Sequence, residues 1–182
     1  MRILTSLRAG ERRLTRRMAS WDSVWARGLL PPVEDAAEHT KLWWAAAVLM
    51  AAGGGRRGRR AATAGIAGMA VGQVLANVVA KQLVGRRRPP KEWFPHDEVE
   101  ERPDSSSFPS GHTAAAVAFT AAVAPIWPWA GAACAVPTVL VAIERVHDGA
   151  HYPSDVAAGA AIGLAAAALV LATPRLLVRR VG

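Results

Sequence analysis

The sequence predicts an all-α integral membrane protein, a bundle of about five transmembrane helices preceded by an N-terminal amphipathic, interfacial helix. Three observations lead to this prediction. Hydrophobic residues make up 52% of the 182-residue chain, and alanine-rich apolar segments follow one another after residue 41. Arginines gather in short clusters between those segments, as in the flanks of membrane spans. The formal net charge of +8 therefore belongs to a membrane surface, and we expect no nucleic-acid partner.

Residues 1–40 are expected to form a basic interfacial segment. The start of the chain lacks the apolar core of a secretory signal peptide, but Ile3, Leu7 and Leu14 recur at helical spacings with arginines between them. A helix with this pattern lies on a lipid surface and buries its apolar face there. The alternative is a solvated helix that packs on its own domain.

Residues 41–182 are expected to form the transmembrane domain. Its apolar segments are 42–55, 61–84, 113–127, 129–146 and 156–178. A bilayer core needs about 20 apolar residues per helix, so the first and third segments are short for a span. The many alanines and glycines favour close contact between helices. The single cysteine, Cys134, lies in an apolar run and is expected to be a small buried side chain.

The arginine clusters orient the predicted spans. One cluster, residues 56–60, is expected to be the loop between the first two spans, and another follows the last span at residues 175–180. Both would be cytoplasmic by the positive-inside rule. The 85–110 and 146–155 loops then share the extracytoplasmic side of the cell membrane. The arginines near the N-terminus oppose this orientation, because five spans place them outside.

Three polar clusters converge on that side, in KQLVGRRRPP (81–90), FPSGHT (108–113) and ERVHDGAHYPSD (144–155). Charged groups at membrane depth are costly unless they have a function. Lys81, Arg88 and Arg145 would suit a phosphate group, because guanidinium offers a fork of donors and ammonium a compact charge. Backbone N–H groups at Ser110 and Gly111, at the start of a helix, would add donors.

Two histidines beside such a pocket would divide the work of hydrolysis. One imidazole can attack phosphorus and hold it covalently, and the other can protonate the leaving oxygen. Asp155 follows His151 by four residues and could accept a hydrogen bond from one of its ring nitrogens, which would fix the tautomer. Pro153 suits the first turn of the last helix.

The three clusters resemble the signature of the type 2 phosphatidic acid phosphatase (PAP2) superfamily. The matching residues are Lys81 and Arg88-Pro89, then Pro109 to His112, then Arg145, His151 and Asp155. The resemblance covers about residues 41–178. It implies that His151 becomes a phosphohistidine, that Asp155 orients it and that His112 is the general acid. It also implies that Lys81, Arg88, Ser110, Gly111 and Arg145 bind the phosphate, with no metal or other cofactor.

Two departures from the family pattern stand out. Glu144 occupies the position of the family's serine beside Arg145; its carboxylate could orient the arginine or weaken the binding of an anionic substrate. Membrane members of the family usually have six spans, so the N-terminal amphipathic segment is a candidate replacement for the first one. The resemblance and the apolar spans together imply a lipid phosphate phosphatase. The candidate substrates are a polyprenyl diphosphate such as undecaprenyl diphosphate, phosphatidate and phosphatidylglycerol phosphate.

Several alternatives stay open at this point. His147, His151 and Asp155 would form a metal site if one helix ran through them, although Pro153 opposes such a helix. Arg86 and Arg87 are expected to be interfacial side chains that extend to the membrane surface, and the acidic residues 97–101 could gate the pocket. A non-catalytic lipid-phosphate-binding protein and a vanadate-dependent, haloperoxidase-like enzyme are the alternative functions.

Overall fold

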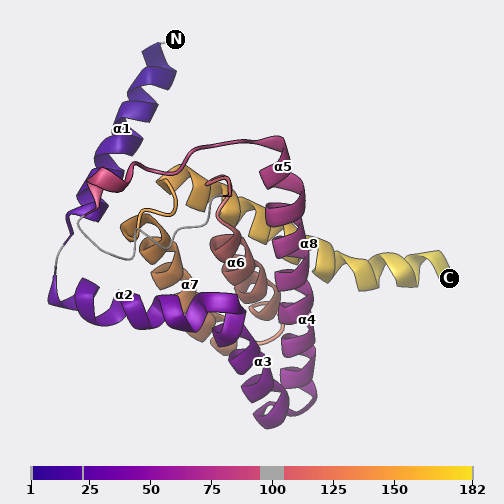
Figure 1. Cartoon of the computed structure of the whole chain (residues 1–182). Coiled ribbons are helices and arrows are strands. Elements are labelled where there is room, and N and C mark those ends of the chain that lie inside the picture. The colour runs from indigo at the N-terminus through magenta and orange to yellow at the C-terminus, as the bar shows by residue number, and fades with distance from the viewer. Residues whose placement is uncertain (1, 22, 95–104, 182) are drawn as a thin grey trace.

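The computed structural model is all-helical throughout the described part of the chain (Figure 1). It describes residues 2–21, 23–94 and 105–181, and the side chains of residues 6, 8–21, 23–94 and 105–173. The acidic residues 97–101, for which a gating role was considered, lie outside this range. The helices are α1 (Arg2–Ala19), α2 (Val24–Ala37), η1 (Glu38–Thr40), α3 (Lys41–Gly53), α4 (Gly55–Gln73), η2 (Val74–Ala80), α5 (Lys81–Leu83), η3 (Lys91–Trp93), α6 (Gly111–Val123), α7 (Pro128–His147) and α8 (Pro153–Val181).

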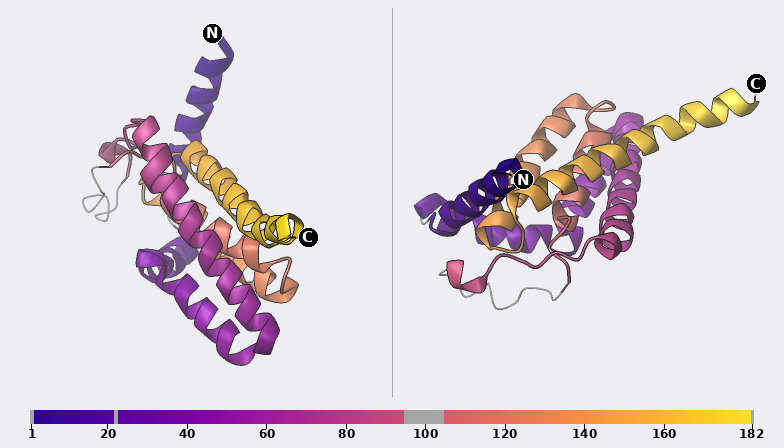
Figure 2. Two further views of the ribbon diagram at one scale, coloured as in Figure 1. Left: turned by 90° about the vertical axis from the view of Figure 1, so that its right-hand side faces the viewer. Right: turned by 90° about the horizontal axis from the view of Figure 1, so that it is seen from above.

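Helix α6 lies at the centre of the bundle and contacts α4, α7 and α8 (Figure 2). Small residues make this position possible. A Cβ atom on Gly163 of α8 would lie 2.6 Å from the carbonyl oxygen of Ala114, and one on Gly159 would lie 2.4 Å from that of Ser110. Helices approach this closely only where no side chain separates their backbones. The contact fixes the start of α6 against the start of α8.

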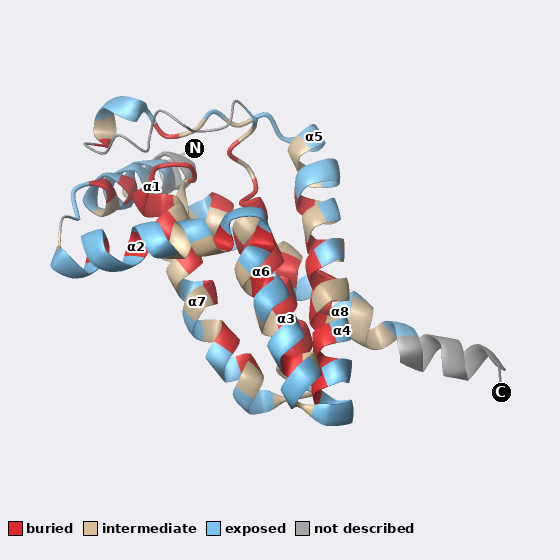
Figure 3. Ribbon diagram, turned by 60° about the horizontal axis from the view of Figure 1, so that its bottom comes forward, coloured by how far each residue is buried: buried red, intermediate tan, exposed pale blue. Residues whose placement is uncertain are grey.

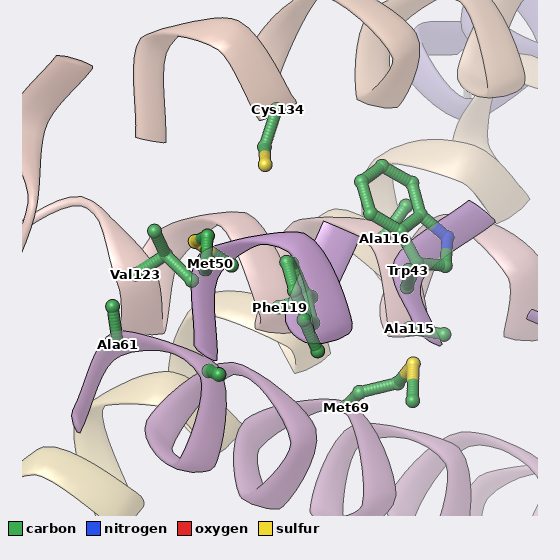
Figure 4. Close-up of a cluster of buried hydrophobic side chains, with 11 residues drawn as sticks. Trp43, Met50, Ala61, Met69, Ala115, Ala116, Phe119, Val123 and Cys134 are labelled. Carbon is green, nitrogen blue, oxygen red and sulfur yellow. The ribbon is translucent and has the colours of Figure 1, made fainter. Parts of the chain in front are cut away.

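An apolar cluster joins α3, α4, α6 and α7 (Figure 4). Trp43 of α3 is buried against Phe119 of α6, with ring centroids 5.5 Å apart. Cys134 is a free, buried thiol at the edge of the same cluster, which is the surrounding that the sequence predicted for it. The cluster holds α3 on the bundle even though α3 is short.

Three continuous helical segments are long and apolar enough to cross a bilayer: Gly55–Leu83, Pro128–His147 and Pro153–Thr173. The first is formed by α4, η2 and α5 in succession. Helices α3 and α6 were expected to be spans as well, but each has only 13 residues, fewer than the roughly 20 that a perpendicular span requires. Length and composition thus support a membrane protein with three long spans.

The arginines at residues 56–60 are helical, so the prediction of a loop there was wrong. The chain reverses at the preceding glycines instead, where Gly55 has a φ of +55°, a conformation that glycine adopts without strain. Arginine is a good helix former, and α4 therefore begins before its apolar stretch. The side chain of Arg57 donates to the carbonyl oxygen of Ile126 at 2.7 Å.

Helix α2 lies across the bundle, whereas α1 projects beyond it at its N-terminal end (Figure 1). Helix α1 contacts α7 and α8, and α2 contacts α7 and α3. The face of α1 that meets the protein carries the small buried residues Thr15 and Ala19, whereas Leu14 and Trp25 of the N-terminal segment are exposed (Figure 3). Part of the apolar surface of this segment is therefore exposed, and its contact with a membrane stays a prediction. Helix α2 continues through Pro31 and Pro32 and ends at Ala37.

Candidate active site

Helix ends that are far apart in sequence meet around one cavity of about 130 Å³. The predicted site residues that line it are Lys81, Arg88, Gly111, His112, Arg145 and His151. They come from α5, from the segment after it, from the first turn of α6, from the end of α7 and from the loop before α8. The three polar clusters of the sequence thus share one cavity, and three of the lining residues are permanent or near-permanent cations, which suits an anionic ligand.

The ring of His151 is buried and held from behind. Its Nδ1 lies 2.5 Å from the carbonyl oxygen of Ser107. A carbonyl only accepts, so Nδ1 carries the proton and Nε2 keeps its lone pair. Burial and then the positive charge of Arg88 hold the pKa of His151 well below its ordinary value, although the bond to Ser107 acts in the opposite direction. The imidazole is therefore neutral and has a nucleophilic nitrogen available.

Asp155 does not hold this ring directly, in contrast to the prediction from its spacing. Its Oδ2 accepts from the backbone N–H of Tyr152 at 2.9 Å, and its Oδ1 accepts from Arg86 at 2.6 Å. An acidic side chain in the first turn that accepts from the N-cap amide is half of a capping box. Asp155 therefore fixes the backbone next to His151, while the carbonyl of Ser107 takes the ring proton.

Arg86 is half-buried and is bonded to side chains of the protein, in contrast to the expectation of a side chain that extends to the membrane surface. Its guanidinium donates to Asp155, to the hydroxyl of Ser154 at 2.7 Å and to Glu11 of α1 at 2.8 Å. The guanidinium carbon also lies 4.2 Å from the ring centroid of Tyr152, a cation–π distance. Burial lowers the pKa of Arg86, but the charges of Asp155 and Glu11 outweigh it and raise the pKa above its ordinary value.

The backbone of Arg86 is bonded as fully as its side chain. Its N–H donates to the hydroxyl of Ser106 at 3.1 Å, and its carbonyl accepts from the N–H of Ser107 at 2.9 Å. Ser107 in turn accepts the ring proton of His151. Sequence reasoning missed this residue because nothing in the run RRR distinguishes one arginine from its neighbours.

Ser110 and Gly111 lie at the start of α6, as predicted, but only Gly111 lines the cavity. The hydroxyl of Ser110 is fully buried, caps the helix by accepting from Thr113 and lies 2.9 Å from the Thr113 hydroxyl. It does not line the cavity. Gly111 does line it, and a Cβ there would lie 2.5 Å from Oδ1 of Asn77, so the space that glycine leaves is taken by an amide.

Arg145 is surrounded by carboxylates. Its Nε donates to Oε2 of Glu144, and its terminal nitrogen Nη2 donates to Oε1 of the same carboxylate at 2.6 Å. The Nη2 atom also lies 2.6 Å from a carboxylate oxygen of Glu34 of α2 and 3.3 Å from one of Asp148. Of the two effects considered for Glu144, the structure contains the first, a fork of hydrogen bonds that orients the arginine. The three carboxylate oxygens lie within 4.8 Å of one another, but the guanidinium already occupies their centre.

The rival metal site on a single helix is not formed. Helix α7 ends at His147 and α8 begins at Pro153, as expected where proline starts a helix. The Nε2 of His147 lies 3.1 Å from the carbonyl oxygen of Trp21, and the two rings meet edge to face with centroids 6.3 Å apart. His147 thus connects the N-terminal segment to α7 and does not face the ligand atoms of His151.

The cavity is also lined by residues that the sequence had not indicated as site residues: His39, Thr40, Gln73, Asn77 and Ala150. Gln73 and Asn77 precede Lys81 by eight and four residues, and this spacing on one helix face was a signal that could have found them. His39 and Thr40 have φ angles of +49° and +60°, which are uncommon for residues with a side chain. The residues around His39 and Thr40 in the sequence carry no signal that predicts this left-handed conformation.

Comparison with known proteins gives a family. Residues 61–179 match the model of the PAP2 superfamily. The chain is 38% identical over 94 residues to a lipid A 1-phosphatase of Rhizobium etli, 40% over 108 residues to a decaprenylphosphoryl-5-phosphoribose phosphatase of Mycobacterium tuberculosis and 34% over 95 residues to an undecaprenyl-diphosphatase of Sulfolobus acidocaldarius. These matches cover 50%, 57% and 50% of this chain, and 40%, 56% and 44% of the relatives. The chain therefore spans about half the length of these curated relatives.

Two solved structures have a similar fold. A PAP2-type phosphatidylglycerolphosphate phosphatase of Bacillus subtilis superposes with a TM-score of 0.69 at 20% identity, over 93% of this chain and 87% of that one. LpxE of Aquifex aeolicus superposes with a TM-score of 0.66 at 22% identity, over 87% of this chain and 93% of that one. At this level of identity the likeness concerns the fold.

Proposed function

The chain belongs to the PAP2 superfamily, and from this membership we propose that it is a membrane lipid phosphate phosphatase that works through a phosphohistidine. The observation that carries the proposal is the neutral ring of His151, whose Nδ1 proton is committed to Ser107, at a cavity lined by Lys81, Arg88 and Arg145. A cavity of about 130 Å³ is far smaller than the roughly 300–1,000 Å³ of drug-sized ligand sites. It therefore suits the terminal phosphate, with the lipid chain left in the bilayer.

The proposed reaction has two steps. Nε2 of His151 attacks phosphorus in line, and the bond to the lipid oxygen breaks. Burial and the charges of Arg145, Lys81 and Arg88 lower the pKa of His112 to about 4 before substrate binds. His112 therefore takes up its proton together with the anionic phosphate, which offsets those cations, and gives it to the departing oxygen. Water then attacks the phosphohistidine and passes a proton to His112, and inorganic phosphate leaves. Lys81, Arg88 and Arg145 stabilise the charge on the phosphoryl oxygens in both transition states. Asp155 acts indirectly, through the backbone of Tyr152 and through Arg86.

As the substrate class we propose a polyprenyl-linked phosphate, with a polyprenyl diphosphate first. Two of the relatives support this choice by name, the undecaprenyl-diphosphatase and the decaprenylphosphoryl-5-phosphoribose phosphatase. Phosphatidate and phosphatidylglycerol phosphate remain the competing substrates. We place the active site on the extracytoplasmic side of the cell membrane, because the arginines at the start of α4 lie at the other end of the bundle.

The test is phosphate release by purified protein in detergent with a chelator present. The substrates are undecaprenyl diphosphate, decaprenylphosphoryl-5-phosphoribose, phosphatidate and phosphatidylglycerol phosphate. Wild-type protein should release phosphate from at least one polyprenyl substrate, and His151→Ala should release none. A His151→Ala variant that keeps the wild-type rate would refute the nucleophile, and a wild-type protein inactive on every lipid phosphate would refute the phosphatase.

A further inference from the structure

A second and larger cavity, of about 1150 Å³, lies at the opposite end of the helix that carries Lys81. We call it the basal groove. It is formed by the first turns of α4, by a late turn of α8 and by the corner between α6 and α7. Its lining residues are Arg56, Arg57, Arg59, Arg60, Thr63, Ala64, Ala67, Ile126, Val170 and Leu171. Arg56 precedes Lys81 by 25 positions in one helical segment, so Arg56 at the rim of the groove lies roughly 35–40 Å from Lys81 at 1.5 Å per residue.

The basal groove combines a cationic rim with apolar walls. Arg57 closes the corner by donating to the carbonyl of Ile126 at 2.7 Å. The guanidinium groups of Arg56, Arg59 and Arg60 are exposed, and the described part of the chain supplies no ion pair or hydrogen bond to them. The walls between α4 and α8 are alanine and aliphatic side chains. Unpaired guanidinium forks are suited to phosphate oxygens, and the walls are suited to a hydrocarbon chain.

We propose that the basal groove binds an anionic phospholipid, with its phosphate on the arginines and one acyl chain between α4 and α8. Basic pockets between membrane helices on the cytoplasmic side bind anionic headgroups of this kind. A second copy of this chain is a poorer occupant, because two arginine-rich rims would repel each other. A zwitterionic lipid would fill the walls but would leave the charge of the rim unmatched.

The test is native mass spectrometry of the full chain extracted from nanodiscs that contain equal amounts of phosphatidylglycerol and phosphatidylcholine. Wild-type protein should retain phosphatidylglycerol in preference to phosphatidylcholine. The triple variant Arg56→Gln/Arg59→Gln/Arg60→Gln removes the rim charge, and Ala67→Trp fills the groove without changing charge. Each should lower the retained phosphatidylglycerol about tenfold, the triple variant because it removes the charged donors to the phosphate, and Ala67→Trp because it blocks the space for the acyl chain.

The matched control removes the same charge elsewhere, with Arg12→Gln/Arg13→Gln/Arg17→Gln on α1, and should retain phosphatidylglycerol like the wild type. Equal loss in this control would mean diffuse surface charge and would overturn the proposal. So would normal retention by Ala67→Trp, or equal retention of the two lipids by the wild type. If Ala67→Trp does not fold, Val170→Trp fills the same groove from the α8 side.

A separate network connects the N-terminal helix to the active site. Glu11 of α1 has a side chain only 15% exposed, and it accepts from Arg86, from the backbone N–H of Ser154 at 3.2 Å and from the Ser154 hydroxyl. Burial raises the pKa of Glu11, but the hydrogen bonds from Ser154 and Arg86 outweigh it and hold the pKa below its ordinary value. An ionised carboxylate of α1 is therefore bonded to the first turn of α8.

From Arg86 two routes lead to His151. The side chain reaches Asp155, which holds the backbone N–H of Tyr152. The carbonyl of Arg86 accepts from Ser107, whose own carbonyl holds Nδ1 of His151. On the basis of the proposed phosphatase activity, we infer that Glu11 and Arg86 are positioning residues, which hold His151 in line for attack without touching the substrate.

The test compares Glu11→Gln with wild type, with Glu11→Asp as the charge-conserving variant and Arg13→Gln as an exposed control on the same helix. We expect Glu11→Gln to lower kcat about tenfold, because bonds between charged groups contribute strongly when partly buried. KM should stay unchanged, because the lining of the cavity stays intact. Glu11→Asp should recover part of the loss, and Arg13→Gln should behave like wild type.

A Glu11→Gln variant with the kcat of the wild type would overturn this inference. A fall in kcat that matches the loss of folded protein in a thermal melt, or a change confined to KM, would overturn it as well. The comparison is distinct from the test of the activity itself. If the wild type has no turnover, the proposed function fails, whereas a working wild type with an unaffected Glu11→Gln variant refutes only the positioning role.

Discussion

At the scale of single residues, the state of His151 follows from its neighbours. The carbonyl of Ser107 fixes the tautomer, and burial with the cation Arg88 disfavours the protonated ring. Lys81 and Arg145 face the same ring and add to this effect. The nucleophilic ring of His151 therefore stays neutral at pH values below the ordinary pKa of histidine.

This consequence predicts the pH dependence of the reaction. Protonation of Nε2 removes the nucleophile, so kcat/KM should fall on the acid side only below the ordinary histidine pKa of about 6.5. Arg88→Gln removes the second-largest cause of the shift. Its acid limb should therefore move upward, toward about 6.5, in addition to a lower rate. The measurement is kcat/KM across the pH range with one substrate, whose own ionisation is the same for both proteins. A wild-type acid limb above the ordinary value would contradict the neutral ring.

Glu144 leads to a second prediction at this scale. Three carboxylates surround Arg145, so negative charge stands close to the site of an anionic substrate. Glu144→Gln removes one charge and keeps an acceptor oxygen, while Glu34 and Asp148 still hold the guanidinium. We expect KM to fall roughly fivefold with kcat little changed, because charges a few ångströms apart interact by about 1–4 kcal/mol near a protein surface.

Steady-state kinetics on the best lipid phosphate would measure the effect of Glu144→Gln. Glu34→Gln is the matched variant, and it should act in the same direction but less, because its side chain is 35% exposed. A large loss of kcat in Glu144→Gln, with KM unchanged, would mean that orientation of Arg145 outweighs the charge.

At the scale of the elements, the start of α8 must lie directly on the start of α6. A Cβ on Gly159 would lie 2.4 Å from the carbonyl oxygen of Ser110, and a backbone atom cannot move aside as a flexible side chain can. Gly159→Ala should therefore destabilise the protein by about 1–3 kcal/mol and should lower activity, since the cap of α6 and the bonds of Asp155 share this contact.

Gly28→Ala in α2 is the control for Gly159→Ala, because nothing lies within 4 Å of a Cβ there. In a helix interior alanine is favoured over glycine by about 0.5–1 kcal/mol, so this variant should be as stable as wild type or more stable. Thermal unfolding in one detergent measures both. A Gly159→Ala protein that melts with the wild type would show that the two helices are not in close contact.

Most of the element order was accessible from the sequence, because apolar length, proline and glycine are local signals. The positions of α3, α6, α7 and α8 follow from them. The start of α4 did not, since a run of arginines reads equally as a loop or as a helical turn. The three clusters and their meeting point could be predicted from spacing. The bonds of Asp155, Arg86 and Glu11 could not, because they depend on how α1 and the segment before α6 pack, which is a tertiary property.

At the scale of the whole molecule, the two polar ends are set apart by one helix. The segment Gly55–Leu83 has 29 residues, about 43 Å at 1.5 Å per residue, and a bilayer core is about 30 Å thick. A helix of this length that crosses the bilayer would place the arginines at the start of α4 on one side of the membrane, and Lys81 of α5 with Arg88 on the other. Helix α1, which carries arginines of its own, lies at the active-site end of the molecule, because its Glu11 forms an ion pair with Arg86.

Arginines lie at both ends of the molecule, so the orientation of the protein in the membrane has to be tested by experiment. We predict that the α4 arginines are cytoplasmic, because they begin a spanning helix within a short connection, where the positive-inside rule acts most strongly. Two single cysteines in a Cys134→Ala background would test this, Glu92→Cys at the active-site end and Arg59→Cys at the other. In intact cells a membrane-impermeant maleimide should label the first and not the second, and permeabilised cells should label both. Labelling of Arg59→Cys alone in intact cells would reverse the topology and place phosphate release in the cytoplasm.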